Sequence, residues 1–396
     1  MYPLLNGVRV LELALLAPDL VGMHLADLGA EVIKVEPPGA GDYLREIGAR
    51  KLAGINLMHL RWNRGKKSIA LDLKRPEGQG LLQRLASHCD VVIDGLRAGA
   101  AARCGADYET LRVVNPRIVY CSISGAGQTG PYSRLATHGV AYDAFAALAP
   151  PSIHADGSPR IPPHTQVGMH AAPLYAAMVV CAALVESART GRGRHVEVAE
   201  LDAAASWHAE RIDAALNQVA SDAPNMSDAV RYQYYRTADD RVLIFQASER
   251  KFWRNFCAAV GRMDLFEARP GAPFGDHARG DEELRRELTR IFRARTRDQW
   301  IELFIAHDVP GGPVHSADEL PDDPHFRARE LLFEQDHPLA GRLRLFATPV
   351  KVPGERFSAT AAPDVGQHTE EVLGRVLGLA SAAIEALRRS GVISGP

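Results

Sequence analysis

The sequence predicts an α/β protein, in which a large domain with a mostly parallel sheet carries a smaller inserted α+β domain. Over residues 7–199, apolar strand-like runs alternate with helical runs, which is the pattern of a parallel sheet covered on both faces. From about residue 222 the pattern changes to a hairpin followed by helices. We therefore expect a large domain over 1–224 and 326–396 and a small domain over 225–325.

The elements of the expected large domain are bounded by turn and cap residues. The run GVRVLEL at 7–13 predicts a buried strand, and Gly29 suits the C-cap of the helix that follows it. Further strands are expected at 31–36, 67–72, 90–94, 117–124 and 195–198, and helices at 20–28, 77–87, 108–113 and 171–190.

The expected small domain begins with two strand-like runs around Ala238-Asp239-Asp240, a pattern typical of a hairpin over 232–247. A stretch rich in Pro, Gly and Asp at 309–324 suits a linker back to the large domain. Helices are expected at 249–260, 281–293 and 296–307, followed in the large domain by a strand at 342–346 and helices at 370–377 and 381–390.

The composition argues against several classes of protein and site. A net charge of −2 gives no electrostatic basis for binding nucleic acid. The five cysteines include no close pair, which argues against a zinc site or disulfides and fits a reducing compartment. The N-terminal residues do not resemble a signal peptide, so we expect a cytoplasmic protein. The uncharged run 171–185 is shorter than the ~20 residues of a membrane span and predicts a buried core helix, with no membrane partner.

A glycine-rich loop, Gly125-x-Gly127-x-x-Gly130, follows the expected strand at 117–124. It matches the letters of the dinucleotide fingerprint, but that motif ordinarily follows the first strand, and it is completed by an acidic residue about 20 positions later, at the end of a second strand. Neither condition is met here. We therefore expect no NAD or flavin, and interpret the loop as a tight turn that brings backbone N–H groups to another ligand.

Two cationic segments stand near expected strands. Arg64 and Lys66 lie in the loop NRGKK, and Arg97 follows the strand at 90–94. The carboxyl ends of parallel strands are where α/β proteins bind ligands, so these cations suit a phosphate-bearing ligand. From spacing alone, a solvated run of charge is the competing interpretation.

His138 lies eight residues beyond Gly130 and is a candidate for proton transfer near neutral pH. Without other information, a surface histidine flanking a helix is the competing interpretation. Glu249 opens an expected helix, where a carboxylate also suits the helix dipole. The remaining histidines of this region show no metal-ligand spacing, and no metal site is expected; they are His154, His164 and His170.

Taken together, several segments resemble the class III (family III) CoA-transferases, a family that includes the α-methylacyl-CoA racemases. The resemblance covers nearly the whole chain. The segments that carry it are GVRVLEL (7–13), LADLGAEVIKVEPPGAGD (25–42), NRGKKSIALDLKRPEG (63–78), DVVIDGLRAG (90–99), NPRIVYCSISGAGQTGPY (115–132), RTGRGRHVEVAELDA (189–203), YYRTADDR (234–241), GPV (312–314) and GQHTEEVL (366–373).

The resemblance implies a Rossmann-like large domain built from both chain ends, with a smaller inserted domain. It also implies an interlocked homodimer that holds acyl-CoA between the large domain of one chain and the small domain of the other. Coenzyme A, as the acyl-CoA substrate, would be the ligand. By the same resemblance, Arg64, Lys66 and Arg97 would face the CoA phosphates.

The resemblance also separates two chemistries. Transferases of the family use an aspartate at the start of the long helix as nucleophile, and the alignment on Val167-Gly168 puts Pro173 at that position. Proline cannot act as nucleophile or base, although it suits the first turn of a helix. No Asp or Glu occurs from 157 to 185. Racemases use this aspartate with a histidine supported by a glutamate, which would be His138 and Glu249 here, and His170 is a candidate for the missing second base.

These considerations favour an enzyme that acts on the α-carbon of a CoA thioester. His138 would remove the α-proton, Glu249 would stabilise the imidazolium, and backbone N–H groups of the glycine loop would stabilise the enolate oxygen. The enzyme would be racemase-like, and a one-base isomerase or lyase in practice. Two alternatives stay open: CoA transfer between carboxylic acids by a mechanism without the aspartate, and a CoA-thioester-binding protein without catalysis.

Overall fold

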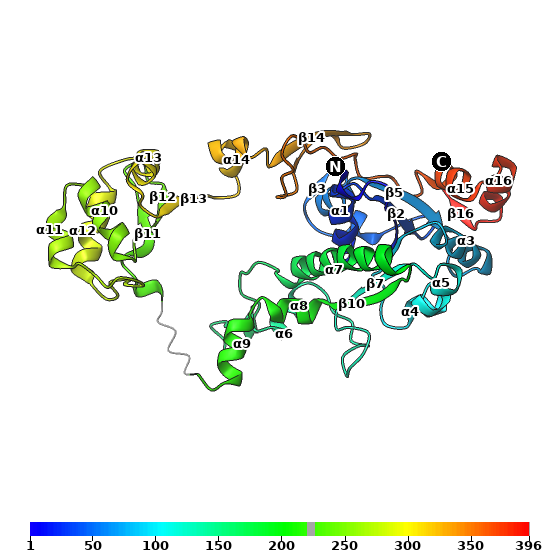
Figure 1. Ribbon diagram of the computed structural model, residues 1–396, viewed down its shortest axis with the longest axis horizontal. Coiled ribbons are helices and arrows are strands. Elements are labelled where there is room, and N and C mark those ends of the chain that lie inside the picture. Colours follow the sequence, from blue (N-terminus) through cyan, green and yellow to red (C-terminus); the bar gives the residue numbers. More distant parts are fainter. Residues whose placement is uncertain (220–225, 396) are drawn as a thin grey trace. The chain divides into compact units, whose positions relative to one another are not determined.

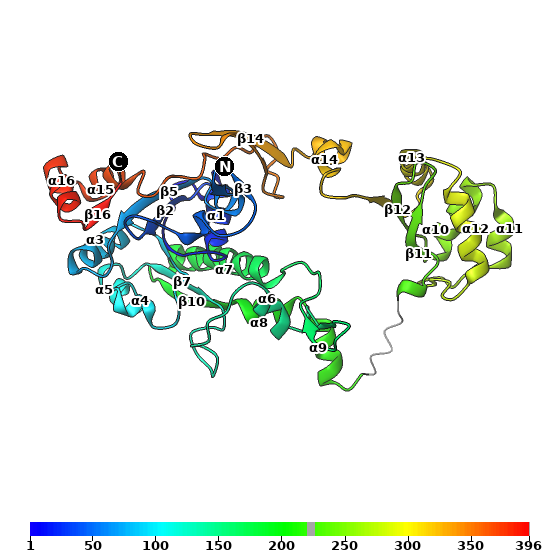
Figure 2. The same ribbon diagram turned by 180° about the vertical axis from the view of Figure 1, so that it is seen from behind.

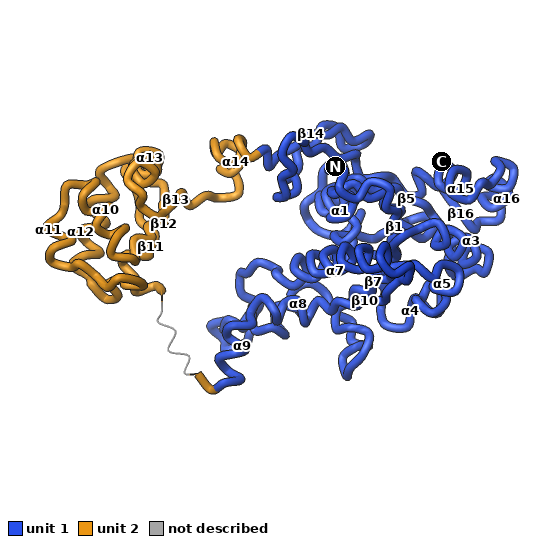
Figure 3. The backbone as a smooth tube through the Cα atoms, in the orientation of Figure 1, with its two compact units in different colours: residues 1–217, 330–396 blue, residues 218–329 orange. Residues whose placement is uncertain are grey.

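The computed structural model describes residues 1–219 and 226–395, and the chain divides into two compact units (Figure 3). Unit 1 comprises residues 1–217 and 330–396, and unit 2 comprises residues 218–329. The first predicted domain boundary, at 224/225, lies outside the described residues. The second, at 325/326, falls inside the short helix α14 (Pro324–Ala328), whose N-cap Asp323 accepts a hydrogen bond from the backbone of Phe326.

Unit 1 is built on a seven-stranded sheet of order β10-β7-β6-β1-β2-β5-β16. All neighbouring strands are parallel except β16, which pairs antiparallel with β5 and brings the C-terminal end of the chain beside the N-terminal strands (Figures 1 and 2). The mostly parallel α/β architecture is thus confirmed. The strands are β1 (Arg9–Leu13), β2 (Glu31–Glu36), β5 (Lys66–Leu71), β6 (Val91–Asp94), β7 (Val119–Ser124), β10 (Arg194–Ala199) and β16 (Ile393–Ser394).

Helices cover both faces of this sheet because successive strand side chains point to opposite sides. Leu11 and Ile33 pack with α3 (Pro76–Ala86), α5 (Tyr108–Val114), α15 (Thr369–Leu377) and α16 (Ser381–Arg389). Their neighbours Val10 and Val32 pack instead with α1 (Asp19–Asp27) and α7 (Gly168–Thr190). Each fully buried aliphatic side chain contributes about 1.5–3 kcal/mol, so these two layers supply much of the stability of the unit.

The long helix α7 lies against β7, β10 and α1 and begins earlier than its sequence pattern predicts. It starts at Gly168 because the Asp143 carboxylate accepts hydrogen bonds from the backbone N–H groups of Val167 and Gly168 at 3.0 and 2.9 Å. Pro173 therefore sits in the second turn and not, as expected, in the first. By length and composition α7 could cross a membrane, but its alanine-rich face is buried in the core of unit 1.

Two helices pack against the start of α7, namely α6 (Val140–Phe145) and α8 (Glu200–Ser206). Gly168 is packed so closely that an added Cβ would lie 2.6 Å from Cβ of Tyr142 and 3.0 Å from Cβ of Ala204. A glycine is therefore required here by close approach of neighbouring elements rather than by its backbone angles.

Unit 2 contains an antiparallel sheet packed against helices around an aromatic core. Phe245 on the central strand contacts Phe256 and Phe292, with ring centroids 4.6 and 5.2 Å apart. The third strand, β13, lies inside the stretch predicted as a linker, so the return to unit 1 begins later than expected. The elements are β11 (Tyr232–Arg236), β12 (Val242–Gln246), α10 (Arg250–Ala259), α11 (Met263–Ala268), α12 (Glu282–Phe292), α13 (Arg297–His307) and β13 (Gly311–Val314).

The remaining elements are short and connect or cover the larger ones. The hairpin of β14 and β15 packs Phe333 against Phe357 and buries Leu343 with Tyr2 and Leu60. These elements are β3 (Lys51–Leu52), β4 (Ile55–Asn56), α2 (Leu57–Trp62), α4 (Ala100–Arg103), β8 (Ser152–Ile153), β9 (Pro159–Arg160), α9 (Ala209–Leu216), β14 (Leu332–His337) and β15 (Gly341–Phe346), with single 3-10 turns at Pro3–Leu5, Tyr43–Arg45, Met226–Asp228 and Leu320–Asp322.

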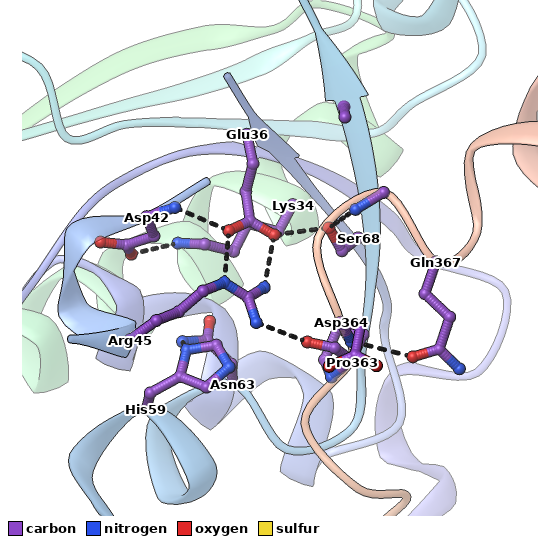
Figure 4. A network of polar contacts seen from close by, with 12 residues as sticks. Lys34, Glu36, Asp42, Arg45, His59, Asn63, Ser68, Pro363, Asp364 and Gln367 are labelled. Carbon is purple, nitrogen blue, oxygen red and sulfur yellow. Dashed lines mark hydrogen bonds and ion pairs between the residues drawn. The ribbon is translucent and has the colours of Figure 1, made fainter. Parts of the chain in front are cut away.

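A buried group of charges lies at the carboxyl edge of β1, β2 and β5 (Figure 4). Nζ of Lys34 donates to the backbone oxygen of Ala14 at 2.8 Å, to a carboxylate oxygen of Asp42 at 2.9 Å and to the Asp19 carboxylate. Burial opposes the charge on Lys34, but Asp19 and Asp42 outweigh it and raise the lysine pKa. Lys34 thus joins the segment after β1 to the segment after β2.

Replacing Lys34 with methionine should be severely destabilising, because it leaves the Asp19 and Asp42 carboxylates buried without their cation. Breaking one side of a buried ion pair costs about 3–5 kcal/mol. The free energy of unfolding, measured by urea denaturation, should fall by that amount. Arg112→Met, which removes the exposed pair with Glu109, should change it by less than about 1 kcal/mol. Equal effects of the two substitutions would contradict this account of Lys34.

Gly168→Ala should destabilise the protein, although alanine favours helix by about 1 kcal/mol over glycine. The new methyl group would overlap Tyr142 and Ala204, and overpacking of this kind costs about 1–3 kcal/mol. Thermal unfolding measures the difference. Gly374→Ala in α15 is the matched control, because the nearest atom to its added Cβ is 3.9 Å away, and it should be neutral or stabilising. A stabilised Gly168→Ala protein would show that the contact is loose.

Candidate active site

Unit 1 contains a cavity of about 600 Å³ at the carboxyl edge of its sheet. Segments at the ends of four of the parallel strands line it: Leu15–Pro18 after β1, Gly95–Ala98 after β6, Ser124–Ala126 at the end of β7 and Glu200 after β10. Loops at this edge of a parallel sheet are the ordinary place for a ligand site, because the strands end together and their loops diverge. The volume is in the range of small-molecule sites.

One wall of the cavity is apolar and is positioned by the buried charges. The Lys34 ammonium group donates hydrogen bonds to Ala14 and to Asp42. Ala14 directly precedes the lining residues Leu15–Pro18, and Asp42 directly precedes the lining residues Tyr43 and Leu44. Met58 and Trp62 of α2 complete this wall. A wall of this composition suits the hydrocarbon part of a ligand.

The glycine loop contributes its first residues to the lining of the cavity. Gly125 lines the cavity, and a Cβ at this position would lie 1.8 Å from Oγ1 of Thr137. Gly127 and Gly130 both have φ of +83°, which favours glycine, but the cavity wall does not include them. The carboxylate of Glu197 accepts the backbone N–H of Gln128, so this loop amide already has a partner. Of the predicted oxyanion loop, only its beginning faces the cavity.

The two residues predicted to act as base and support belong to different units. His138 is exposed, precedes α6 and lines the cavity beside Thr137. Glu249 lies in unit 2 at the N-cap of α10, where its carboxylate accepts the Ser248 hydroxyl at 3.1 Å. The position of His138 fits a role in the site. The support of His138 by Glu249 stays a prediction.

The start of α7 differs from the sequence expectation. Pro173 is buried in the second turn and is not part of the cavity wall, whereas Met169 in the first turn and Gln166 before it are. A side chain from the helix start would reach the cavity from position 169 and not from 173. The rings of His170 and Trp62 are perpendicular, with 6.3 Å between their centroids, and His170 lies outside the cavity wall. Burial, and next the charge of Arg61, lower the pKa of His170.

Of the three cations expected at a phosphate, the cavity wall includes Arg97 but not Arg64 or Lys66. Arg64 is buried and pairs with Asp27 at 2.6 Å, and Lys66 is buried and pairs with Glu12 at 2.6 Å. Their charges are balanced inside the chain by carboxylates that the local sequence does not reveal. Arg97 is exposed, and Arg103 of α4 also lines the cavity. The site therefore has two arginines for an anionic group.

The cavity lining also includes a carboxylate that is not among the site residues predicted from the sequence, Glu200. Glu200 is 2% exposed, and burial raises its pKa to about 7, although a hydrogen bond from Tyr142 favours the ionised form. Its Oε1 has no hydrogen-bond partner among the described residues. One signal was available in the sequence, because Glu200 directly follows a strand of a parallel sheet. Within residues 1–219 and 226–395, no cluster of His, Cys, Asp or Glu could hold a metal ion.

Comparison with known proteins agrees with the family resemblance of the sequence over nearly the whole chain. Residues 5–369 match the family model described as CoA-transferase family III. The chain is 33% identical to succinyl-CoA:glutarate CoA-transferase of Mus musculus, with 98% of this chain and 90% of that protein aligned. It is also 33% identical to succinyl-CoA–D-citramalate CoA-transferase of Chloroflexus aurantiacus, with 98% of each chain aligned.

Solved structures agree with this relationship. The fold resembles the crystal structure of the hypothetical protein Rv3272 from Mycobacterium tuberculosis, with a TM-score of 0.78, 29% identity and coverage of 94% of this chain and 99% of that one. A CaiB/BaiF family protein from Brucella suis gives a TM-score of 0.76 at 28% identity, with 95% and 99% covered. Family model, full-length relatives and fold all agree, and the chain belongs to the family III CoA-transferases.

Proposed function

We propose that this protein transfers coenzyme A from an acyl-CoA thioester to a free carboxylic acid. The main structural support for this proposal is the cavity at the carboxyl edge of the sheet, which combines an apolar wall, the start of a glycine loop and two arginines. The curated relatives that align with 98% of the chain and are named as CoA-transferases support the same reaction. This proposal replaces α-carbon chemistry as the favoured function, because those names describe transfer rather than racemisation.

Different residues of the cavity would contact different parts of a bound CoA thioester. The apolar wall with Met58 and Trp62 would contact the acyl chain and the arm of the cofactor, while Arg97 and Arg103 would pair with phosphate or with the acceptor carboxylate. Backbone at Gly125 would lie near the thioester oxygen, where charge develops during acyl transfer. We expect short dicarboxylic acids as the first acids to test, since the names of the two transferases above specify succinyl-CoA, glutarate and D-citramalate.

A CoA-exchange assay tests the reaction directly. Succinyl-CoA and a longer acyl-CoA are each incubated with a panel of isotope-labelled carboxylic acids, and labelled acyl-CoA is measured by mass spectrometry. Labelled thioester should appear, with free donor acid released in equal amount. Tight binding of CoA thioesters without exchange on any acid would instead support a non-catalytic binding protein.

Proton chemistry at the α-carbon is the second candidate, because His138 lines the same cavity as Gly125. The same incubations in deuterated water distinguish it from transfer. If transfer is the activity, acyl-CoA should gain little α-deuterium, and His138→Ala should leave exchange of CoA within about 10-fold of the unchanged protein. Deuterium incorporation that His138→Ala abolishes would favour the α-carbon reaction.

Arg97→Ala should weaken binding of the CoA ester. Loss of one charge-assisted hydrogen bond costs about 1.5–3 kcal/mol, which raises KM by roughly 10-fold or more with a smaller effect on kcat. Steady-state kinetics measure this change, and Arg112→Ala on the exposed face of α5 is the control. An unchanged KM in Arg97→Ala would remove Arg97 from the binding site.

We further propose that the protein works as a homodimer in the cytoplasm. The outer face of α7 exposes Leu174, Met178 and Val185, which are 46, 62 and 52% exposed in the single chain, and such a run suits burial against a second copy. The five cysteines are free thiols, which suits a reducing compartment. Light scattering after size-exclusion chromatography should give twice the chain mass.

A further inference from the structure

We propose that Glu200 is the nucleophilic carboxylate of this cavity and takes the place of the acid that the start of α7 does not provide. The inference rests on the proposed CoA transfer and adds the residue that performs it. Two observations carry it: the position of Glu200 in the cavity wall, and its lack of a charge partner.

The position of Glu200 follows from the order of strands. β10 lies beside β7 in the parallel sheet, so the residues after these two strands meet at the carboxyl edge. The backbone N–H of Leu201 donates to the backbone oxygen of Gly125 at 2.9 Å and joins the two segments. Glu200 and the start of the glycine loop therefore form adjacent parts of one wall. A thioester whose carbonyl lies over Gly125 would have the carboxylate beside it.

The electrostatic surroundings of Glu200 differ from those of three other buried carboxylates in unit 1. Glu12, Asp27 and Asp42 each contact a lysine or arginine at 2.6–2.9 Å. Within the described part of the chain, Asp94 and Asp143 are also buried without a lysine or arginine partner, but each accepts a hydrogen bond from a backbone N–H group. Among the described residues Glu200 has no such cation, and one of its oxygens has no hydrogen-bond partner. Burying an unpaired acid is costly. A glutamate kept only to favour the dipole of α8 would do so from the surface without that cost, so the buried position indicates use by a ligand.

The rest of the cavity offers no competing carboxylate. Glu200 is the one acidic side chain among the described residues that line it. The start of α7 presents Met169 to the cavity, and no Asp or Glu occurs from 157 to 185. The close contact of α7 with α8, through Gly168, brings the two helix starts to the same corner of the cavity. A carboxylate from α8 can thus serve where one from α7 is absent.

The chemistry needs only the two substrates of the proposed reaction. The ionised Glu200 attacks the thioester carbon of the donor, a C–O bond forms, the C–S bond breaks, and CoA leaves as thiolate with the bonding electrons. The thiolate attacks the Glu200 carbonyl of this anhydride, releasing the donor acid and leaving a glutamyl-CoA thioester. The acceptor carboxylate attacks this thioester and displaces the thiolate, which then attacks the acceptor carbonyl. Acceptor acyl-CoA forms and Glu200 is regenerated as carboxylate.

The protonation of Glu200 gives the reaction a pH dependence. Burial raises the pKa of Glu200 to about 7, against the opposing hydrogen bond of Tyr142, and Arg97 and Arg103 also line the cavity. The nucleophile is the ionised form, so kcat/KM should rise as pH rises through about 7 and then level off. His138 also faces the cavity, so the profile should be measured in His138→Ala as well, where this rise should persist.

An oxygen label identifies the nucleophile. In the last step the oxygen that joined the acceptor to the anhydride stays on the enzyme, so a heavy-oxygen-labelled acceptor should leave label on Glu200. The full-length protein is incubated with succinyl-CoA and labelled glutarate or another acid that the exchange assay shows to be active. After proteolysis, the peptide with Glu200 should carry the label. Transfer without label in this peptide would overturn the assignment.

Substitutions at Glu200 provide a second test of its role. Glu200→Gln should lower exchange at least 1,000-fold, as expected when a covalent nucleophile is lost, and Glu200→Asp should retain part of the activity. Glu200→Gln should also be as stable as the unchanged protein or more stable above neutral pH, because it removes a buried charge. Asp202→Asn, an exposed carboxylate on the same helix, is the control and should keep full activity. Wild-type exchange in Glu200→Gln would overturn the inference.

The two proposals fail in different ways. Exchange that persists in Glu200→Gln, with unlabelled Glu200, rejects this residue and leaves CoA transfer in place. Absence of exchange for every donor and acid, in protein that binds CoA thioesters, rejects both the transfer and the role of Glu200 in it.

Discussion

The three contacts of the Lys34 ammonium group connect the fold to its cavity. Lys34 lies on β2, next to the central strand β1, and reaches the backbone of Ala14 and the carboxylates of Asp19 and Asp42, all buried at the carboxyl edge of the sheet. The segments that carry these partners continue directly into the apolar wall of the cavity. A charge this deeply buried is tolerated only with its partners in place, so it holds the two segments in one arrangement.

Pairing of buried charges also explains why only some of the basic side chains near the sheet are available to a ligand in the cavity. Arg64 and Lys66 are basic side chains like Arg97, but the charge of Arg64 is balanced inside the chain by Asp27 and that of Lys66 by Glu12, and both residues contribute to the fold. Arg97 and Arg103 remain for a ligand in the cavity wall. Glu200 is the opposite case, an acid buried without a cation. Charges that are paired stabilise structure, while charges left unpaired at the edge of a cavity are available for chemistry.

Much of the fold could be predicted, because strands and helices here follow local patterns. The strand expected at 31–36 is β2 with the same ends, and the other main strands of the parallel sheet differ by two residues or fewer at each end. The predicted element boundaries are wrong where a residue distant in sequence determines the local structure. The start of α7 depends on Asp143, 25 residues before Gly168. β13 and β16 are strands only because β12 and β5 lie beside them.

By itself, the sequence determined the α/β class, the family and the positions of the main elements, since periodicity and long motifs are properties of neighbouring residues. Only the tertiary structure decided which side chains meet. It placed Pro173 away from the cavity and Met169 in its wall, and it buried Arg64 and Lys66. It also brought Glu200 to the glycine loop, because β10 pairs with β7 across some 75 residues of chain. Pairing between distant strands and the balance of buried charge depend on partners that no local pattern contains.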